Sequence, residues 1–405
     1  MPITAMSAIP TSYASHPPSP LPIRSLKSRL PEVGTTIFTV MSALAAKHNA
    51  VNLGQGFPDF ECDPLLIDEV ADAMRQGLNQ YPPMSGIASL RAAIAQKIST
   101  LYGTNYNVDT EITVTAGATQ GVLTTILCCV HPGDEVIVIE PAYDCYVPAI
   151  ELAGGTPVFV SMHLDASGYH TPWDQVAAAV TDKTRLIVIN SPHNPTGSVL
   201  RCDDLDKLSE IVDGTDILVL SDEVYEHMVF DGARHESVCR YPKLVSRTFV
   251  VSSFGKTYHV TGWKVGYVAA PAPLMAEFRK VHQFNVFTVN TPVQHGLAAY
   301  MNNPQPYLSL SAFYQQKRDY FRAGLAGSRL RLLPADGTYF QCVDYSAVAS
   351  ISEIEFATWL TTEIGVAAIP VSAFYRTPKE SSIVRFCFAK KEATLASAID
   401  RLLKI

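Results

Sequence analysis

The sequence predicts an α/β protein with a large domain, built on a mostly parallel sheet flanked by helices, and a smaller α+β domain. Between Glu111 and about Ala270, short β-branched runs alternate with amphipathic segments. Apolar runs this continuous are typical of parallel strands buried on both faces. After Pro292 the pattern changes to a helical stretch followed by short strands. The chain has 405 residues, of which 47% are hydrophobic, which suffices for two domains.

The elements follow in order along the chain. Residues 1–24 are rich in Pro and Ser, so we expect a flexible segment. We expect 25–55 to pack with the small domain, 56–295 to form the large domain and 296–405 the small C-terminal domain. Strands are predicted at 112–115, 135–139, 156–160, 185–190, 216–221 and 248–253, with helices at 119–130 and 203–212. The tail is predicted to contain helices over 292–325, strands near 338–343 and 382–388, and a final helix at 391–404.

Composition excludes several classes of protein. The formal net charge is −7 and there is no long basic run, which disfavours a nucleic-acid binder. No apolar stretch approaches the ~18 residues of a membrane helix, and the N-terminus lacks the pattern of a secretory signal. The eight cysteines include no C-x-x-C pair, so we expect free thiols and no metal site. We therefore expect a cytoplasmic protein that binds neither membrane nor nucleic acid.

Two small-residue or Asn-rich clusters follow predicted strands. In open α/β sheets, ligands bind at the carboxyl ends of the strands. TAGATQG (115–121) precedes a helix whose free N–H groups suit a phosphate, although an ordinary strand-to-helix turn fits as well. In NSPHNPTG (190–197), Asn190 and Asn194 could orient a polar ligand or only stabilise a buried turn.

Three charged side chains occupy apolar settings. Asp222 ends a buried strand and needs a cation, either a protonated ligand nitrogen or a distant Arg. Lys256 lies in a Gly-containing loop where a lysine can act as nucleophile or base, with Ser253 and Lys264 as candidate phosphate ligands, although surface-loop lysines are more common. Arg385 interrupts an apolar strand, as an arginine that binds a carboxylate or forms an internal ion pair would.

Taken together and in this order, these clusters resemble the class I/II aminotransferases of fold type I, which depend on pyridoxal 5′-phosphate. The similarity is greatest to the branch of methionine and kynurenine/glutamine aminotransferases, and it covers roughly Arg29 to the C-terminus. It rests on LGQGFPDF (53–60), NQYPPMSG (79–86), EPAYDCY (140–146), SDEVYEH (221–227), GKTYHVTGWKVGY (255–267) and VRFCF (384–388). The resemblance implies a seven-stranded type of sheet in a large cofactor-binding domain.

The resemblance implies a role for each matching residue around the cofactor ring. Lys256 would hold the cofactor covalently and act as the catalytic base. Asp222 would pair with the protonated pyridine nitrogen, which keeps the ring an electron sink. Tyr225 and Asn194 would bind its phenolic oxygen, and Tyr143, a position often occupied by Phe in relatives, would stack on its face.

The phosphate and the substrate have implied ligands too. The phosphate would be held by the N–H groups of Ala118 and Thr119, by Ser253 and by Lys264, where many members of the family have Arg. Tyr81 would reach the cofactor of a second subunit, which implies a homodimer. The substrate carboxylate would bind Arg385, Asn190 and the backbone near Gly56. The expected substrate pocket is apolar and aromatic, formed by Ile37, Tyr81, Tyr143 and Phe287.

Such a pocket favours methionine, with aromatic amino acids or His as further donors and a 2-oxo acid as acceptor. Thr288 stands where kynurenine-type relatives often have His. The alternative is a kynurenine/glutamine-type aminotransferase with cysteine-conjugate C–S β-lyase activity. An effector-sensing domain of a transcription regulator is disfavoured, because only about 24 residues precede the match. His227, His259 and His282 are interpreted as structural.

Overall fold

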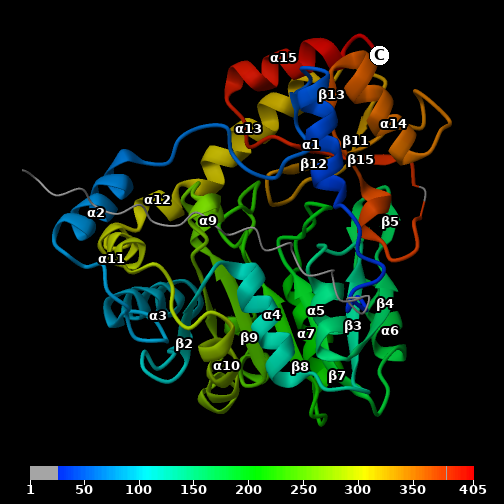
Figure 1. The fold of residues 1–405 in the computed structure, drawn as a ribbon. Helices are drawn as coiled ribbons and strands as arrows, with labels where there is room; N and C mark the ends of the chain where they lie inside the picture. Colours follow the sequence, from blue (N-terminus) through cyan, green and yellow to red (C-terminus); the bar gives the residue numbers. More distant parts are fainter. Residues whose placement is uncertain (1–25, 380) are drawn as a thin grey trace, which may run out of the picture.

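The computed structural model describes residues 26–379 and 381–405, so the predicted flexible segment 1–24 lies outside the described residues. A large sheet with helices on both faces forms one part of the molecule. A smaller sheet forms the other part, together with the first described helix and the C-terminal helix (Figure 1). None of the helices in these two ranges is long and apolar enough to cross a membrane.

The large sheet has seven strands in the order β2-β10-β9-β8-β7-β3-β4. All neighbouring pairs are parallel except those of β10, which is antiparallel to both β2 and β9. The strands are β2 (Ile112–Thr115), β3 (Glu135–Glu140), β4 (Thr156–Ser161), β7 (Thr184–Asn190), β8 (Leu218–Asp222), β9 (Thr248–Ser253) and β10 (Gly266–Ala269).

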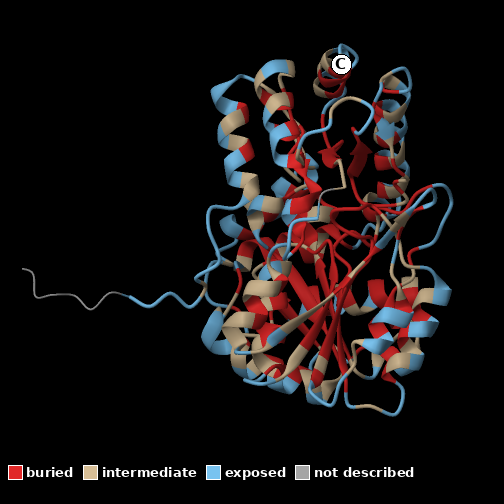
Figure 2. Ribbon diagram, turned by 90° about the vertical axis from the view of Figure 1, so that its right-hand side faces the viewer, coloured by how far each residue is buried: buried red, intermediate tan, exposed pale blue. Residues whose placement is uncertain are grey.

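Alternate side chains of these strands enter two separate cores. Val136 and Val138 pack with one group of helices, whereas Ile137 and Ile139 pack with the other group. The first group is α4 (Ala118–Cys129), α5 (Tyr146–Ala153) and α10 (Ala272–Asn285). The second group is α2 (Pro64–Arg75), α3 (Ala88–Tyr102), α6 (Trp173–Ala178), α7 (Cys202–Val212), α8 (Pro242–Val245) and α11 (Thr291–Tyr300). Burial on both faces explains why these strands are apolar without alternation (Figure 2).

The smaller part joins the two ends of the described chain. Its four-stranded antiparallel sheet has the order β11-β12-β15-β14, and β1 (Val51–Asn52) pairs with β13 (Val366–Ala367). The other strands are β11 (Arg331–Leu332), β12 (Phe340–Asp344), β14 (Ile369–Pro370) and β15 (Ile383–Cys387). Its helices are α1 (Ile37–Lys47), α13 (Leu310–Gly324), α14 (Glu353–Trp359) and α15 (Glu392–Leu402). The short helix α12 (Gln305–Leu308) precedes α13, and its Tyr307 packs in a core of the large sheet. A β-hairpin of β5 (His163–Asp165) and β6 (Gly168–His170) follows β4 of the large sheet.

The predicted α/β class is confirmed, and each strand predicted between 112 and 253 is present within two residues. The predicted helices at 119–130 and 203–212 correspond to α4 and α7, and the tail elements correspond to α11–α13, β12, β15 and α15. The sequence did not predict β10, which is short, begins at a glycine and fills the gap between β2 and β9. The domain limits remain predictions.

Candidate active site

A cavity of about 340 Å³ lies between the carboxyl ends of the large-sheet strands and the smaller sheet. It collects residues that lie far apart in the sequence, from Phe38 to Arg385. Its lining includes twelve of the residues predicted for the cofactor and the substrate: Gly56, Ala118, Thr119, Tyr143, Asn190, Asn194, Asp222, Tyr225, Ser253, Lys256, Lys264 and Arg385.

Lys256 lies in the short helix α9 (Phe254–Thr257), which follows directly after β9. Its Nζ donates hydrogen bonds to the hydroxyl of Tyr339 at 2.9 Å and to the carbonyl of Gly56 at 3.2 Å. Burial lowers the pKa of Lys256 to about 8. A substantial fraction of this amine is therefore neutral near pH 7–8, which is the form that acts as a nucleophile or a base.

Asp222 ends strand β8 and is 5% exposed. The Tyr146 hydroxyl donates to Oδ2 at 2.7 Å, and the Val224 N–H donates to Oδ1 at 3.2 Å. Burial raises the pKa of Asp222 to about 6, against the lowering effect of the Tyr146 hydrogen bond. No Lys, Arg or His in the described ranges forms an ion pair with this carboxylate, so a distant arginine partner is not what stabilises it. The carboxylate is placed to bind a cationic ligand atom.

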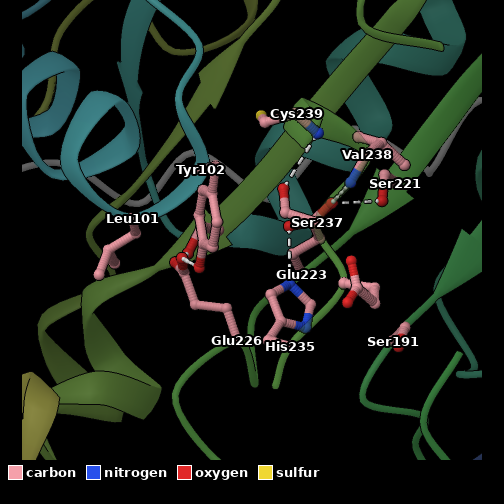
Figure 3. Close-up of polar contacts among 12 residues, drawn as sticks. Leu101, Tyr102, Ser191, Ser221, Glu223, Glu226, His235, Ser237, Val238 and Cys239 are labelled. Carbon is pink, nitrogen blue, oxygen red and sulfur yellow. Dashed lines mark hydrogen bonds and ion pairs between the residues drawn. The ribbon is translucent and has the colours of Figure 1, made fainter. Parts of the chain in front are cut away.

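The turn after Asp222 is anchored from its other side by two buried glutamates (Figure 3). Glu223 accepts hydrogen bonds from Ser221 Oγ at 2.9 Å and from the Val238 N–H at 3.1 Å, and pairs with His235 at 2.9 Å. Glu226 accepts from the Tyr102 hydroxyl at 2.5 Å, from Lys97 at 2.5 Å and from Ser252 at 2.6 Å. These bonds fix the segment that carries Asp222 and Tyr225 toward the cavity.

The N-terminus of α4 lies beside Lys264, and together they are suited to bind an anion. No side chain within residues 26–379 and 381–405 caps this helix, so the first-turn N–H groups at Ala118 and Thr119 lack a capping acceptor, and both residues line the cavity. A Cβ placed on Gly117 would lie 3.4 Å from Nζ of Lys264, which locates the ammonium next to this turn. Ser253 also lines the cavity. N–H groups with an adjacent ammonium and a hydroxyl suit a phosphate.

Arg385 is fully buried on β15 and has no carboxylate partner in the described ranges. Nη1 donates to Asn194 Oδ1 at 2.7 Å and Nη2 donates to the Gly54 carbonyl at 3.1 Å, whereas Nε has no partner among the residues that the structure describes. The ring of Phe340 lies 3.9 Å from the guanidinium carbon. A buried guanidinium with unused N–H groups at a cavity is suited to bind a carboxylate.

Asn190 connects the end of strand β8 at Asp222 with the turn that contains Asn194. Its Nδ2 donates to the Asp222 carbonyl at 2.9 Å and its Oδ1 accepts from the Asn194 N–H at 2.8 Å.

The ring of Tyr225 packs edge-to-face on Tyr339, with centroids 5.2 Å apart. Burial raises the pKa of the Tyr225 phenol above its usual value, so the hydroxyl stays protonated and can donate.

The groups that line the cavity match the chemical groups of pyridoxal phosphate. The N-terminus of α4 at Gly117 suits the phosphate, the unpaired buried Asp222 suits a protonated ring nitrogen, and the lowered pKa of Lys256 suits attachment to an aldehyde. The unpartnered Nε of Arg385 is left for the carboxylate of an amino acid.

Comparison with known proteins assigns the family. The family model for class I and II aminotransferases matches residues 48–402. The chain belongs to this family. It is similar to the methionine aminotransferase of Escherichia coli K12, at 51% identity over 93% of this chain and 97% of that protein. It is also similar to the kynurenine–oxoglutarate transaminase of Dictyostelium discoideum, at 36% identity over 92% and 94% of the two chains.

The fold agrees with the family. The crystal structure of YbdL from Escherichia coli, which identified a methionine aminotransferase function, matches with a TM-score of 0.92 and 50% identity over 94% of this chain and 99% of that one. The protein is thus an aminotransferase of fold type I, and its family in general depends on pyridoxal phosphate.

Three residues of the predicted substrate pocket do not line this cavity. Ile37 does not line the cavity but packs into the core of the smaller part, and its neighbour Phe38 lines the cavity instead. Tyr81 and Phe287 are 82% and 46% exposed and contact each other with ring centroids 5.4 Å apart. They lie outside the cavity of their own chain, so the predicted grouping with Tyr143 does not form within one chain.

Sequence reasoning missed four aromatic residues of this aminotransferase site: Phe38, Tyr146, Tyr339 and Phe340. Tyr146 stands inside the motif EPAYDCY, so its spacing from Tyr143 could have suggested it. Phe38 directly follows Ile37, the residue that was predicted to line the substrate pocket. Tyr339 and Phe340 carry no local signal, because their roles depend on a close approach to Gly56, where an added Cβ would lie 3.0 Å from the Phe340 ring.

Proposed function

We propose that this aminotransferase uses pyridoxal phosphate to transfer the amino group of methionine, and of aromatic amino acids, to a 2-oxo acid. The observation that carries the proposal is the charge of the cavity lining. Its lining cations are Lys256, Lys264 and Arg385, so Arg385 is its sole guanidinium among the described residues. A substrate with a side-chain carboxylate would need a second cation that the lining does not offer, because the two lysines have other partners in this proposal.

The apolar part of the lining supports a neutral side chain. Phe38, Phe57, Tyr143 and Phe340 contribute rings to the cavity. Aromatic rings and a thioether attract one another by about 0.3–1.5 kcal/mol per contact. The 51% identity to a methionine aminotransferase points in the same direction.

Each residue of the site has one task in the transfer. Arg385 binds the carboxylate of the amino acid and thereby orients its Cα–H. Bound pyridoxal phosphate supplies an electron sink conjugated to that carbon. Asp222 holds a proton on the ring nitrogen, and Tyr225 and Asn194 donate to the phenolic oxygen. Neutral Lys256 would take the proton from Cα and would return it to the carbon on the cofactor side of the transferred nitrogen.

A homodimer is part of the proposal. Tyr81 is 82% exposed beside Phe287, as expected of a side chain that contacts the cofactor of a second copy. Sedimentation should give a dimer, and an active monomer would contradict this part. Location in the cytoplasm stays a prediction.

The donor preference is tested with single turnovers of the cofactor-loaded protein. Methionine should convert the bound cofactor at least about tenfold faster, per unit concentration, than aspartate. Equal rates with aspartate would contradict the proposed neutral-side-chain pocket. The alternative, a kynurenine-type enzyme with C–S β-lyase activity, predicts faster conversion by kynurenine and release of pyruvate from a cysteine conjugate.

A further inference from the structure

Tyr339 directly precedes strand β12 and contacts Lys256, but it is not among the residues that line the cavity. It is 0% exposed and belongs to the core of the smaller part. Its hydroxyl donates to the Gly56 carbonyl at 2.5 Å and accepts from Lys256 Nζ at 2.9 Å. The three polar atoms therefore form a closed triangle, because Nζ also lies 3.2 Å from the same carbonyl.

The direction of each bond in this triangle follows from the protons available. The single proton of the Tyr339 hydroxyl is engaged by Gly56, so toward Lys256 the hydroxyl oxygen can only accept. Burial raises the pKa of Tyr339 well above its usual value, so the phenol keeps that proton. Lys256 must then donate an N–H on this side, and its lone pair cannot point there.

The remaining side of the amine faces the cavity. Both acceptors lie on the same side of Nζ, since they are only 2.5 Å apart. We propose that Tyr339 is a positioning residue that, together with the Gly56 carbonyl, holds the free amine of Lys256 with its lone pair directed into the cavity. This inference rests on the proposed function, in which neutral Lys256 takes the Cα proton.

The chain offers a matched control in Tyr314. This residue is also 0% exposed, and its ring centroid lies 5.6 Å from that of Tyr339. Its hydroxyl has no hydrogen-bond partner within residues 26–379 and 381–405. Tyr314→Phe and Tyr339→Phe each remove one buried hydroxyl from the same aromatic cluster. The hydroxyl that contacts Lys256 is removed in Tyr339→Phe alone.

The test uses the cofactor-free protein first, so that the readout does not depend on activity. Formaldehyde with cyanoborohydride methylates neutral amines, and peptide mass spectrometry compares Lys256 with Lys264 of the same cavity. Tyr339→Phe should slow methylation of Lys256 relative to Lys264 about tenfold, and Tyr314→Phe should leave the ratio within twofold. In the loaded enzyme, Tyr339→Phe should lower kcat about tenfold and leave the KM of methionine within twofold.

Three other outcomes would overturn either the positioning role of Tyr339 or the proposed function. Equal methylation ratios in Tyr339→Phe and the unchanged protein would overturn the positioning role. Equal losses in both variants would show that any missing hydroxyl in this cluster disturbs the site, which also overturns it. Failure of the unchanged protein to attach pyridoxal phosphate at Lys256 would instead refute the proposed function, so the two failures are distinguishable.

Discussion

Replacement of Arg385 by lysine separates a geometric role from a role of charge alone. The guanidinium already donates to Asn194 and to the Gly54 carbonyl, and it keeps Nε and further N–H groups for a ligand. A lysine ammonium has three N–H groups and no planar fork. It cannot satisfy both protein acceptors and both carboxylate oxygens at once.

The expected loss follows from one missing charge-assisted hydrogen bond. Such a bond contributes about 1.5–3 kcal/mol, which corresponds to about 10- to 150-fold in kcat/KM. Most of it should appear as a higher KM, because the carboxylate contact is made before and during the reaction. The assay is the single-turnover conversion of the bound cofactor by methionine, followed by absorbance over a range of concentrations.

Arg318 supplies the control. It is 7% exposed, forms a bidentate pair with Asp231 at 2.6 and 2.7 Å, and lies outside the cavity lining. Arg318→Lys should change kcat/KM less than threefold, even if the free energy of unfolding falls. If Arg385→Lys also stays within threefold, the substrate carboxylate binds elsewhere and not at Arg385.

Three further predictions address the lysine and the packing. Lys256→Ala should prevent borohydride from trapping the cofactor, whereas trapping on that variant would place the linkage elsewhere. Methylation of Lys256 in the cofactor-free protein should rise with pH and reach half its maximum near pH 8, because burial lowers this pKa to about 8; a midpoint near 10.5 would refute it. The unfolded chain then binds more protons between about pH 8 and 10.5, so this group makes the free energy of unfolding rise with pH there. Gly296→Ala should lower the free energy of unfolding by about 1–3 kcal/mol in urea titrations, since the added Cβ would lie 2.4 Å from Val70 Cγ2, whereas Gly327→Ala has open space and should cost less than half as much.

The sequence predicted those parts of the fold that have a local signal. Strands β3 and β7 are runs of β-branched residues, and burial on both faces makes such runs continuous. Strand β10 has four residues within a Gly-rich loop, and it exists because β2 and β9 flank it on both sides. Pairing between segments about 150 residues apart leaves no mark in the strand itself.

The same division applies to the site. Lys256, Asp222 and Arg385 stand out in the sequence because charged residues are costly in apolar strands and loops unless they bind something. That reasoning alone leaves a surface lysine or an internal ion pair open, and the resemblance to class I/II aminotransferases supplied the expected roles. The choice between Ile37 and Phe38 depends on the rotational phase of α1, and both residues are apolar, so the sequence does not decide it. The contact of Tyr339 with Gly56 joins positions 283 residues apart, which only the packing of the smaller part determines.

The most direct test of the central claim is the absorbance spectrum of the purified protein before and after methionine is added without any 2-oxo acid. The proposed function predicts a yellow protein whose visible band is replaced by the near-ultraviolet band of pyridoxamine phosphate. A yellow protein that methionine does not bleach would contradict the methionine assignment. A colourless protein that pyridoxal phosphate cannot reconstitute would contradict the account of the site as a whole.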